Sequence, residues 1–259
     1  MLILLPPSES KAVPRRGRPM DLAALGFSGL EPARARVLAA LVGLCAGDPA
    51  TAAATLGVPP SRLGLVAANA ALRTAPAARA DRVYTGVLYE ALDVPTLSTG
   101  ARRRAANRLA IASSLFGLVR PADRIPAYRL PGDAVLPAVG SVAGLWRGHL
   151  GAAVTEAVGG GLLVDLRSSM YAAFWRPPAG GARRVATVRV LHEVSGRRQV
   201  VSHFNKATKG RLVRALLEAG VDARVPATLA GALTDLGWTV ELGEPGTRST
   251  PLDVIVRAL

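Results

Sequence analysis

The chain has little of the residue types on which many functional sites depend. Its 259 residues include one cysteine and three histidines. One thiol excludes an internal disulfide framework, and no Cys/His spacing resembles that of a zinc site. Cys45 lies in an apolar stretch and is interpreted as a small buried hydrophobic residue. We therefore expect no metal centre.

Long apolar segments and common nucleotide-binding motifs are also missing. No run approaches the ~20 apolar residues of a membrane span, and no basic region precedes the opening MLILL, as a signal peptide requires. No glycine-rich run matches a phosphate-binding loop or a dinucleotide fingerprint, and no G-x-S-x-G elbow occurs. We expect a soluble, cytoplasmic protein that has no cofactor and does not contact a membrane.

Lysine is scarce although positive charge is abundant. The net charge is +14, yet only three of the 32 basic residues are lysines, namely Lys11, Lys206 and Lys209. A compact ammonium group can lose its proton when it is desolvated, whereas a guanidinium stays charged. The three lysines are therefore candidate functional residues, and chance in so small a sample is the alternative.

The positive charge is concentrated in three segments. Residues 95–130 contain seven arginines and one acidic residue, residues 183–214 contain nine basic residues and one acidic residue, and residues 9–18 carry a net charge of +3. Concentrated basic charge attracts polyanions. We expect DNA, duplex or branched, or a phosphorylated small ligand as the partner. An arginine-rich surface that repulsion keeps soluble is the alternative.

Residue patterns predict an α/β (mixed α+β) fold. Apolar runs predict buried strands at residues 1–5 and 161–166. Helical patterns with Gly and Pro breaks occupy residues 31–79, and further helices are predicted from Ser98 and from Gly144. Strand patterns predict a hairpin around Ser195-Gly196 and a closing pair at residues 238–242 and 251–259. No linker is visible, so we expect one domain, residues 1–259, with a mixed sheet, surrounding helices and a basic cleft.

A basic helix is predicted to begin at Asn205. Lys206 and Lys209 are three positions apart on one face of it. They lie in the first turns, where free backbone N–H groups and the helix dipole favour an anion. Two cations there are unfavourable unless something negative binds, so the pattern predicts an anion site, with His203 just before it and Arg211 just after.

The segment SSLFGLVRPADRIPAYRLPGD, residues 113–133, has a Phe-Gly-Leu pivot followed by Arg120 and Pro121. This pattern resembles a hairpin between two helices. Helix–hairpin–helix elements bind DNA through backbone amides that contact phosphates, and glycines such as Gly117 allow the close approach.

Several motifs in order resemble the YaaA family, bacterial proteins linked to peroxide stress. The resemblance extends over nearly the whole chain and includes the phrases PPSESK, VYTG, SSLFGLVRPADRIPAYRL, LVDLRSSMY and FNKATKGR. The matching positions are Lys11, Gly117, Arg120, Pro121, Asp123, Tyr128, Arg129, Ser168, Tyr171, Lys206 and Lys209.

The resemblance implies a single-domain mixed α/β fold with a positively charged cleft. It also implies DNA binding through a helix–hairpin–helix-like element and a role in limiting damage from peroxide and iron, without implying a reaction. The chain departs from the family pattern at Pro131 and Met170, where acidic residues are frequent. Catalytic or metal-binding carboxylates at those positions would be absent here.

Two functional hypotheses remain. The first is a DNA-binding stress protein whose arginines neutralise phosphates, with Lys206 and Lys209 anchoring one. The second is an enzyme acting on a nucleotide, a nucleoside or a DNA lesion, with Lys11 or Lys206 as nucleophile or acid/base after burial and neighbouring cations lower its pKa. The candidate binding residues are Ser8, Glu9, Lys11, Tyr84, Gly117, Arg120, Tyr128, Arg129, Asp165, Ser168, Tyr171, His203, Lys206, Lys209 and Arg211.

Overall fold

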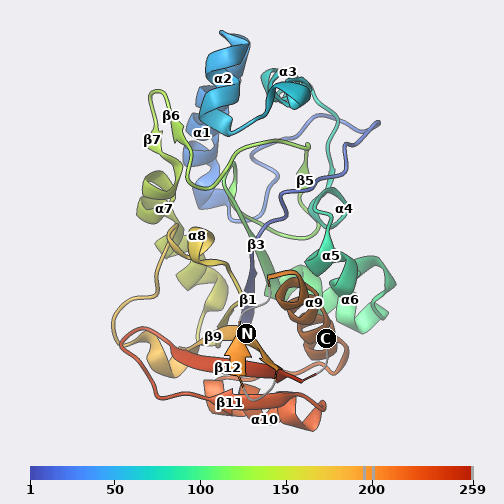
Figure 1. Ribbon diagram of the computed structural model, residues 1–259, viewed down its shortest axis with the longest axis vertical. Helices are drawn as coiled ribbons and strands as arrows, with labels where there is room; N and C mark the ends of the chain where they lie inside the picture. Colours follow the sequence, from blue (N-terminus) through green and yellow to red (C-terminus); the bar gives the residue numbers. More distant parts are fainter. Residues whose placement is uncertain (195–196, 200–201, 258–259) are drawn as a thin grey trace.

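A mixed β-sheet lies at the centre of the computed structural model, which describes residues 1–194, 197–199 and 202–257 (Figure 1). Its strands are β1 (Leu2–Leu5), β3 (Leu109–Ser113), β4 (Gly117–Val119), β8 (Leu163–Asp165), β9 (Val185–Val194), β10 (Arg197–Gln199), β11 (Thr239–Leu242) and β12 (Thr250–Val256). The order is β11-β12-β9-β8-β1-β3-β4, and β10 also pairs with β9. β12, β9, β8, β1 and β3 are parallel, whereas β4, β10 and β11 are antiparallel to their partners.

Helices cover both sides of this sheet. They are α1 (Glu31–Ala46), α2 (Pro49–Leu56), α3 (Gly64–Ala70), α4 (Ala80–Val83), α5 (Val87–Leu92), α6 (Thr99–Arg108), α7 (Val142–Val158), α8 (Ser169–Ala172), α9 (Ser202–Glu218) and α10 (Pro226–Asp235). In Figure 1, α7 lies on one side of β1, and α5, α6 and α9 lie on the other. Helices α1–α3 gather beyond the end toward which β1 points, together with the short pairs β2–β5 (Ala78–Arg79, Arg124–Ile125) and β6–β7 (Val135–Leu136, Gly140–Ser141).

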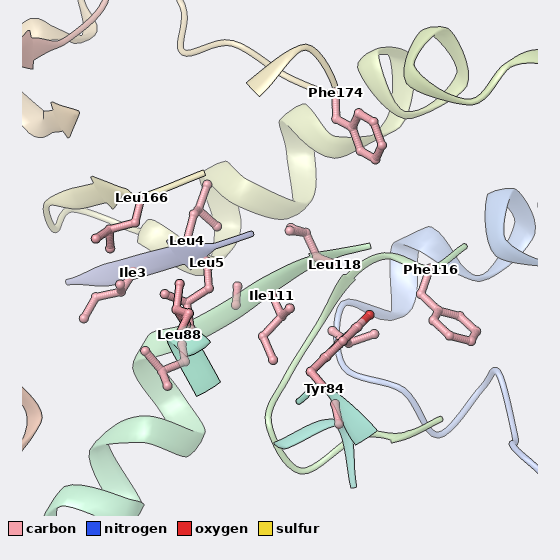
Figure 2. Close-up of a cluster of buried hydrophobic side chains, with 14 of the residues drawn as sticks. Ile3, Leu4, Leu5, Tyr84, Leu88, Ile111, Phe116, Leu118, Leu166 and Phe174 are labelled. Carbon is pink, nitrogen blue, oxygen red and sulfur yellow. The ribbon is translucent and has the colours of Figure 1, made fainter. Parts of the chain in front are cut away.

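Strand β1 brings the chain to the carboxyl edge of the sheet. Its four residues are buried, and it pairs in parallel with β3 and β8, so both of its edges and both of its faces are covered. Figure 2 shows Leu4 on one face and Ile3 and Leu5 on the other, where Leu88 of α5 also lies. Prolines at positions 6 and 7 then end the strand because they lack the N–H that a ladder needs.

The segment around the Phe-Gly-Leu pivot is a β-hairpin and not a helix–hairpin–helix element. Strands β3 and β4 pair antiparallel, with Ser113 opposite Gly117. Gly117 has φ +71°, and a Cβ at this position would come within 2.7 Å of the Trp146 ring. Glycine is therefore required here by backbone conformation and packing. The helical pattern that begins at Ser98 ends at Arg108, where a buried apolar run takes over.

The other fold predictions hold in most respects. The structure confirms a single-domain mixed α/β fold, the β9–β10 pairing and the β11–β12 pair. The predicted hairpin turn, Ser195-Gly196, lies outside the described residues. Cys45 is 5% exposed, as expected of a packing residue. Helix α9 begins at Ser202, three residues before the predicted start.

The described residues contain neither a candidate membrane-spanning helix nor a candidate metal-binding cluster. None of their helices is long and apolar enough to cross a bilayer. No cluster of three or more His, Cys, Asp or Glu side chains within these ranges is arranged to hold a metal ion.

Candidate active site at the carboxyl edge of the sheet

Lys11 lies just beyond the end of β1, in a backbone position set by the segment after α4. Lys11 and Tyr84 form an isolated antiparallel bridge. The Ala12 N–H donates to the Val83 carbonyl at 2.9 Å, and the Thr85 N–H donates to the Ser10 carbonyl at 3.2 Å. Two segments distant in sequence thus hold the lysine at the edge where ligands of parallel α/β sheets ordinarily bind.

The Lys11 ammonium group is enclosed by backbone carbonyls and tyrosine rings. Its Nζ donates to the Ser8 carbonyl at 2.8 Å and to the Glu9 carbonyl at 3.4 Å. Nζ also stands 4.4 Å from the Tyr128 ring centroid and 5.6 Å from that of Tyr84. Burial lowers the pKa of Lys11 to about 8, with a smaller contribution from Arg129 and opposition from Glu9. About a tenth of such amines are neutral at pH 7.

A chain of buried hydroxyls backs this lysine. The Tyr84 and Tyr128 hydroxyls are 2.9 Å apart, and the Tyr128 hydroxyl is 2.8 Å from Ser113 Oγ. Ser113 Oγ in turn accepts from the Phe116 N–H at 3.0 Å. Burial raises the pKa of both tyrosines. They therefore stay protonated and supply hydrogen bonds rather than negative charge.

Arg129 is positioned by a buried asparagine of α3. Asn69 Oδ1 accepts from the Arg129 N–H at 2.9 Å, and Asn69 Nδ2 donates to the Arg129 carbonyl at 2.7 Å. The Arg129 guanidinium lies 3.6 Å from the Glu9 carboxylate. Asn69 is fully buried and was not among the candidates from sequence, although a polar residue on an apolar helix face was the available signal.

A cavity of about 850 Å³ opens beside Lys11. Its charged lining residues are Glu9, Lys11, Arg62 and Arg129, and its other polar side chains include Ser10, Asn69, Thr74, Thr85 and Tyr128. The volume is in the range of small-molecule sites. An excess of cations over anions in the lining favours an anionic ligand.

Asp165 and Lys209 form a second group at the end of β8, and both are engaged in internal contacts. The Asp165 carboxylate accepts from Arg167 Nε at 2.9 Å and from Arg167 Nη2 at 2.7 Å. Lys209 Nζ donates to the Leu166 carbonyl at 2.9 Å, and burial lowers its pKa while Asp165 opposes this. Arg167, which was not among the candidates from sequence, pairs with the Asp165 carboxylate.

Tyr171 belongs with the Lys11 group, whereas Ser168 stands at the start of α8. Burial raises the pKa of Tyr171, and the nearby Tyr128 and Glu9 raise it further. Ser168 is exposed and its side chain makes no capping bond to the described helix. The structure thus brings seven of the candidate residues to one edge of the sheet: Ser8, Glu9, Lys11, Tyr84, Tyr128, Arg129 and Tyr171.

Other candidates serve packing or face solvent. Arg120 Nη1 donates to the Asn107 and Leu109 carbonyls at 3.0 and 2.9 Å, and its guanidinium lies 4.3 Å from the Phe27 ring centroid. Lys206 and Arg211 are exposed on α9. The start of α9 at Ser202 places Lys206 in the second turn and Lys209 in the third, beyond most of the free N–H groups. The side chain of His203 lies outside the described part of the chain.

The arginines of residues 95–130 are largely committed to internal contacts. Six of the seven donate to backbone carbonyls or pair with an acidic side chain: Arg102, Arg104, Arg108, Arg120, Arg124 and Arg129. A guanidinium has five donors, so one arginine can tie two distant segments together. Much of the local charge excess therefore has a structural use.

The fold and the site together define a mixed α/β protein with a partly buried, weakly basic lysine at the carboxyl edge of its parallel strands. The chain belongs to the family described as Peroxide stress protein YaaA, which it matches over residues 1–241. It is 50% identical over 258 residues to a UPF0246 protein of Streptomyces coelicolor, covering 99% of this chain and 98% of that relative. A UPF0246 protein of Corynebacterium efficiens is 40% identical over 246 residues, covering 94% and 96%. The family resemblance found in the sequence is confirmed.

Proposed function

We propose that this protein is an enzyme acting on a DNA lesion, the abasic sugar of a damaged strand, and that Lys11 is its reacting amine. The observation that carries the proposal is the environment of Lys11 Nζ. It is held by the Ser8 carbonyl, covered by the Tyr128 and Tyr84 rings and placed on the wall of the cavity. Desolvation of this kind is how proteins obtain a nucleophilic lysine near neutral pH.

The chemistry that suits this amine is addition to the carbonyl carbon of a sugar aldehyde. Lys11 first releases its proton to solvent. Nζ then forms a bond to the aldehyde carbon, the carbonyl oxygen takes up a proton, and loss of water from this carbinolamine leaves an imine. Arg129 and Arg62, which also line the cavity, would bind the phosphate of the same nucleotide.

The test is reductive trapping. Duplex DNA carrying one abasic site is incubated with the protein and borohydride, and the lysine that carries the adduct is identified by peptide mapping. We expect an adduct on Lys11 that disappears in Lys11→Arg, because a guanidinium cannot form the imine. Lys206→Arg is the matched control and should retain it. Absence of an adduct from the native protein, or an adduct that persists in Lys11→Arg, would refute the proposal.

A second candidate is DNA binding without chemistry, to duplex or branched DNA. It is favoured by three exposed arginines, Arg15, Arg16 and Arg18, which directly follow the cavity-lining residues Val13 and Pro14. Backbone binding through such arginines would weaken steeply with salt and show little base preference. A salt titration of linear and branched duplexes tests it. Salt-sensitive binding that Lys11→Arg retains, with no trapped adduct, would favour this candidate over the enzyme.

A further inference from the structure

A second hollow, about 470 Å³ in volume, lies beside α7, away from the Lys11 cavity in sequence and in lining residues. Three arginines from separate parts of the chain line it: Arg147 from α7, Arg176 from the segment after α8, and Arg248 from the segment before β12. His149 and Trp175 also line the hollow and add two further side chains with ring nitrogens. No acidic side chain of the described residues lines this hollow.

The backbone orients two of these arginines. Arg147 Nε donates to the Ala173 carbonyl at 3.3 Å, and Arg248 Nη1 donates to the Pro177 carbonyl at 2.7 Å. Each bond uses part of a guanidinium that has five donors in a planar fork. The arginine side chains are exposed, so their other N–H groups can reach a ligand in the hollow.

Trp175 supplies a fixed neutral donor beside them. It is 9% exposed, and the Arg167 guanidinium lies 5.7 Å from its ring centroid. Gly151 lies beside this donor, since a Cβ at this position would stand 3.5 Å from Trp175 Nε1, an ordinary contact distance. Indole N–H is a donor only, and it therefore requires an acceptor on any ligand that meets it.

We infer that this hollow binds a phosphate group, with Arg147, Arg176 and Arg248 as its cations and Trp175 Nε1–H as a neutral donor. Three guanidinium groups that line one hollow without a carboxylate repel one another, and an oxyanion relieves that repulsion. Phosphate oxygens match the guanidinium fork and accept from the indole. The phosphate belongs either to a free nucleotide or to a nucleic-acid backbone. This hollow shares no lining residue with the Lys11 cavity.

Trp175 makes the site measurable by fluorescence. The chain has three tryptophans, and the other two are Trp146 and Trp238. Inorganic phosphate, thymidine 5′-monophosphate and a ten-residue oligothymidylate are each titrated at constant ionic strength. We expect a saturable change in emission that is lost in Trp175→Phe, and a tenfold or greater loss of affinity in the double variant Arg147→Gln/Arg176→Gln.

A second double variant, Arg36→Gln/Arg224→Gln, removes the same charge from two exposed positions elsewhere and should bind as the native protein does. Lys11→Arg should also bind normally, which separates this site from the proposed active site. Tighter binding of the oligonucleotide identifies a nucleic-acid backbone as the source, and tighter binding of the mononucleotide identifies a free nucleotide. No saturable change with any probe, or equal losses in the two double variants, would overturn the inference. Should the first double variant fail to fold, Arg176→Gln alone leaves both anchoring bonds in place.

Discussion

The carboxyl edge of the sheet and helix α9 share the three lysines of the chain, yet they use the same side chain in three ways. Lys11 is enclosed by carbonyls and tyrosine rings, and its pKa falls to about 8. Lys209 is half-buried and ties α9 to the Leu166 carbonyl. Lys206, one turn earlier, faces solvent. Scarcity of lysine identified the candidates, but the surroundings of each amine decide what it can do.

The largest expected difference between these regions is in amine reactivity. Acetic anhydride labelling across a pH series should show half-maximal reaction of Lys11 near pH 8. An unperturbed lysine side-chain amine reaches this midpoint near about pH 10.4. At pH 8 this favours the neutral form by roughly two orders of magnitude over an ordinary amine. Mass spectrometry of the three lysine peptides provides the readout, and Lys206 supplies the reference for an exposed side chain. A Lys11 midpoint above pH 10 would remove the argument for a nucleophile.

The same burial should make stability depend on pH. Since the folded-state pKa of Lys11 is depressed from 10.5 to about 8, the unfolded chain binds more protons between these values, and folding is favoured as the pH rises through them. The native protein should therefore gain roughly 2 kcal/mol of unfolding free energy relative to Lys11→Met between pH 7 and pH 10. Urea unfolding of both proteins measures this. A difference that does not change with pH would show that Lys11 is solvated.

On α9, replacing Lys209 should cost stability rather than chemistry. Lys209→Met removes the donor to the Leu166 carbonyl, and an unsatisfied buried acceptor costs about 1–3 kcal/mol. Thermal or urea unfolding gives the value. The trapped adduct on Lys11 should still form in this variant. Loss of the adduct with unchanged stability would instead place Lys209 in the chemistry.

The smallest effect is expected at Lys206. Because its side chain is exposed, Lys206→Gln should change the unfolding free energy by less than about 0.5 kcal/mol. If DNA binds along α9, the slope of log affinity against log salt should fall by about 0.9, which corresponds to one phosphate contact. Fluorescence anisotropy over a salt series resolves such a change. An unchanged slope would place the DNA path elsewhere on the surface.

Much of the fold follows from local patterns. The buried run at residues 2–5, the long helix α7 and the closing pair β11–β12 each carry a period or a turn signal that identifies them. The β3–β4 hairpin carries no such signal. Its first strand directly follows a helical pattern, and no glycine or proline separates the two. The Phe-Gly-Leu pivot suits a turn between strands as well as one between helices.

The candidate site was likewise only partly predictable from the sequence. Family motifs placed Lys11, Tyr84, Tyr128 and Arg129 among the candidates, and the structure brings them together. Asn69 was missed because it matters through Arg129, a residue far away in sequence, and no local pattern records that partner. Ser113 and Arg167 have nearer partners, Tyr128 and Asp165, but no periodicity or spacing in the sequence indicates these contacts.

The sequence by itself determined the chemical inventory: three lysines in a chain of arginines, a family membership carried by ordered motifs, and two buried strands, at residues 1–5 and 161–166. Only the tertiary structure decided which lysine is poised to react. The pKa of an amine depends on its desolvation, and Lys11 loses solvent to tyrosines 73 and 117 positions further along the chain. The same holds for the arginines. A guanidinium that the fold places beside backbone carbonyls, as at Arg120, is used in internal hydrogen bonds. One that the fold places on the wall of a hollow, as at Arg176, is available to an anion.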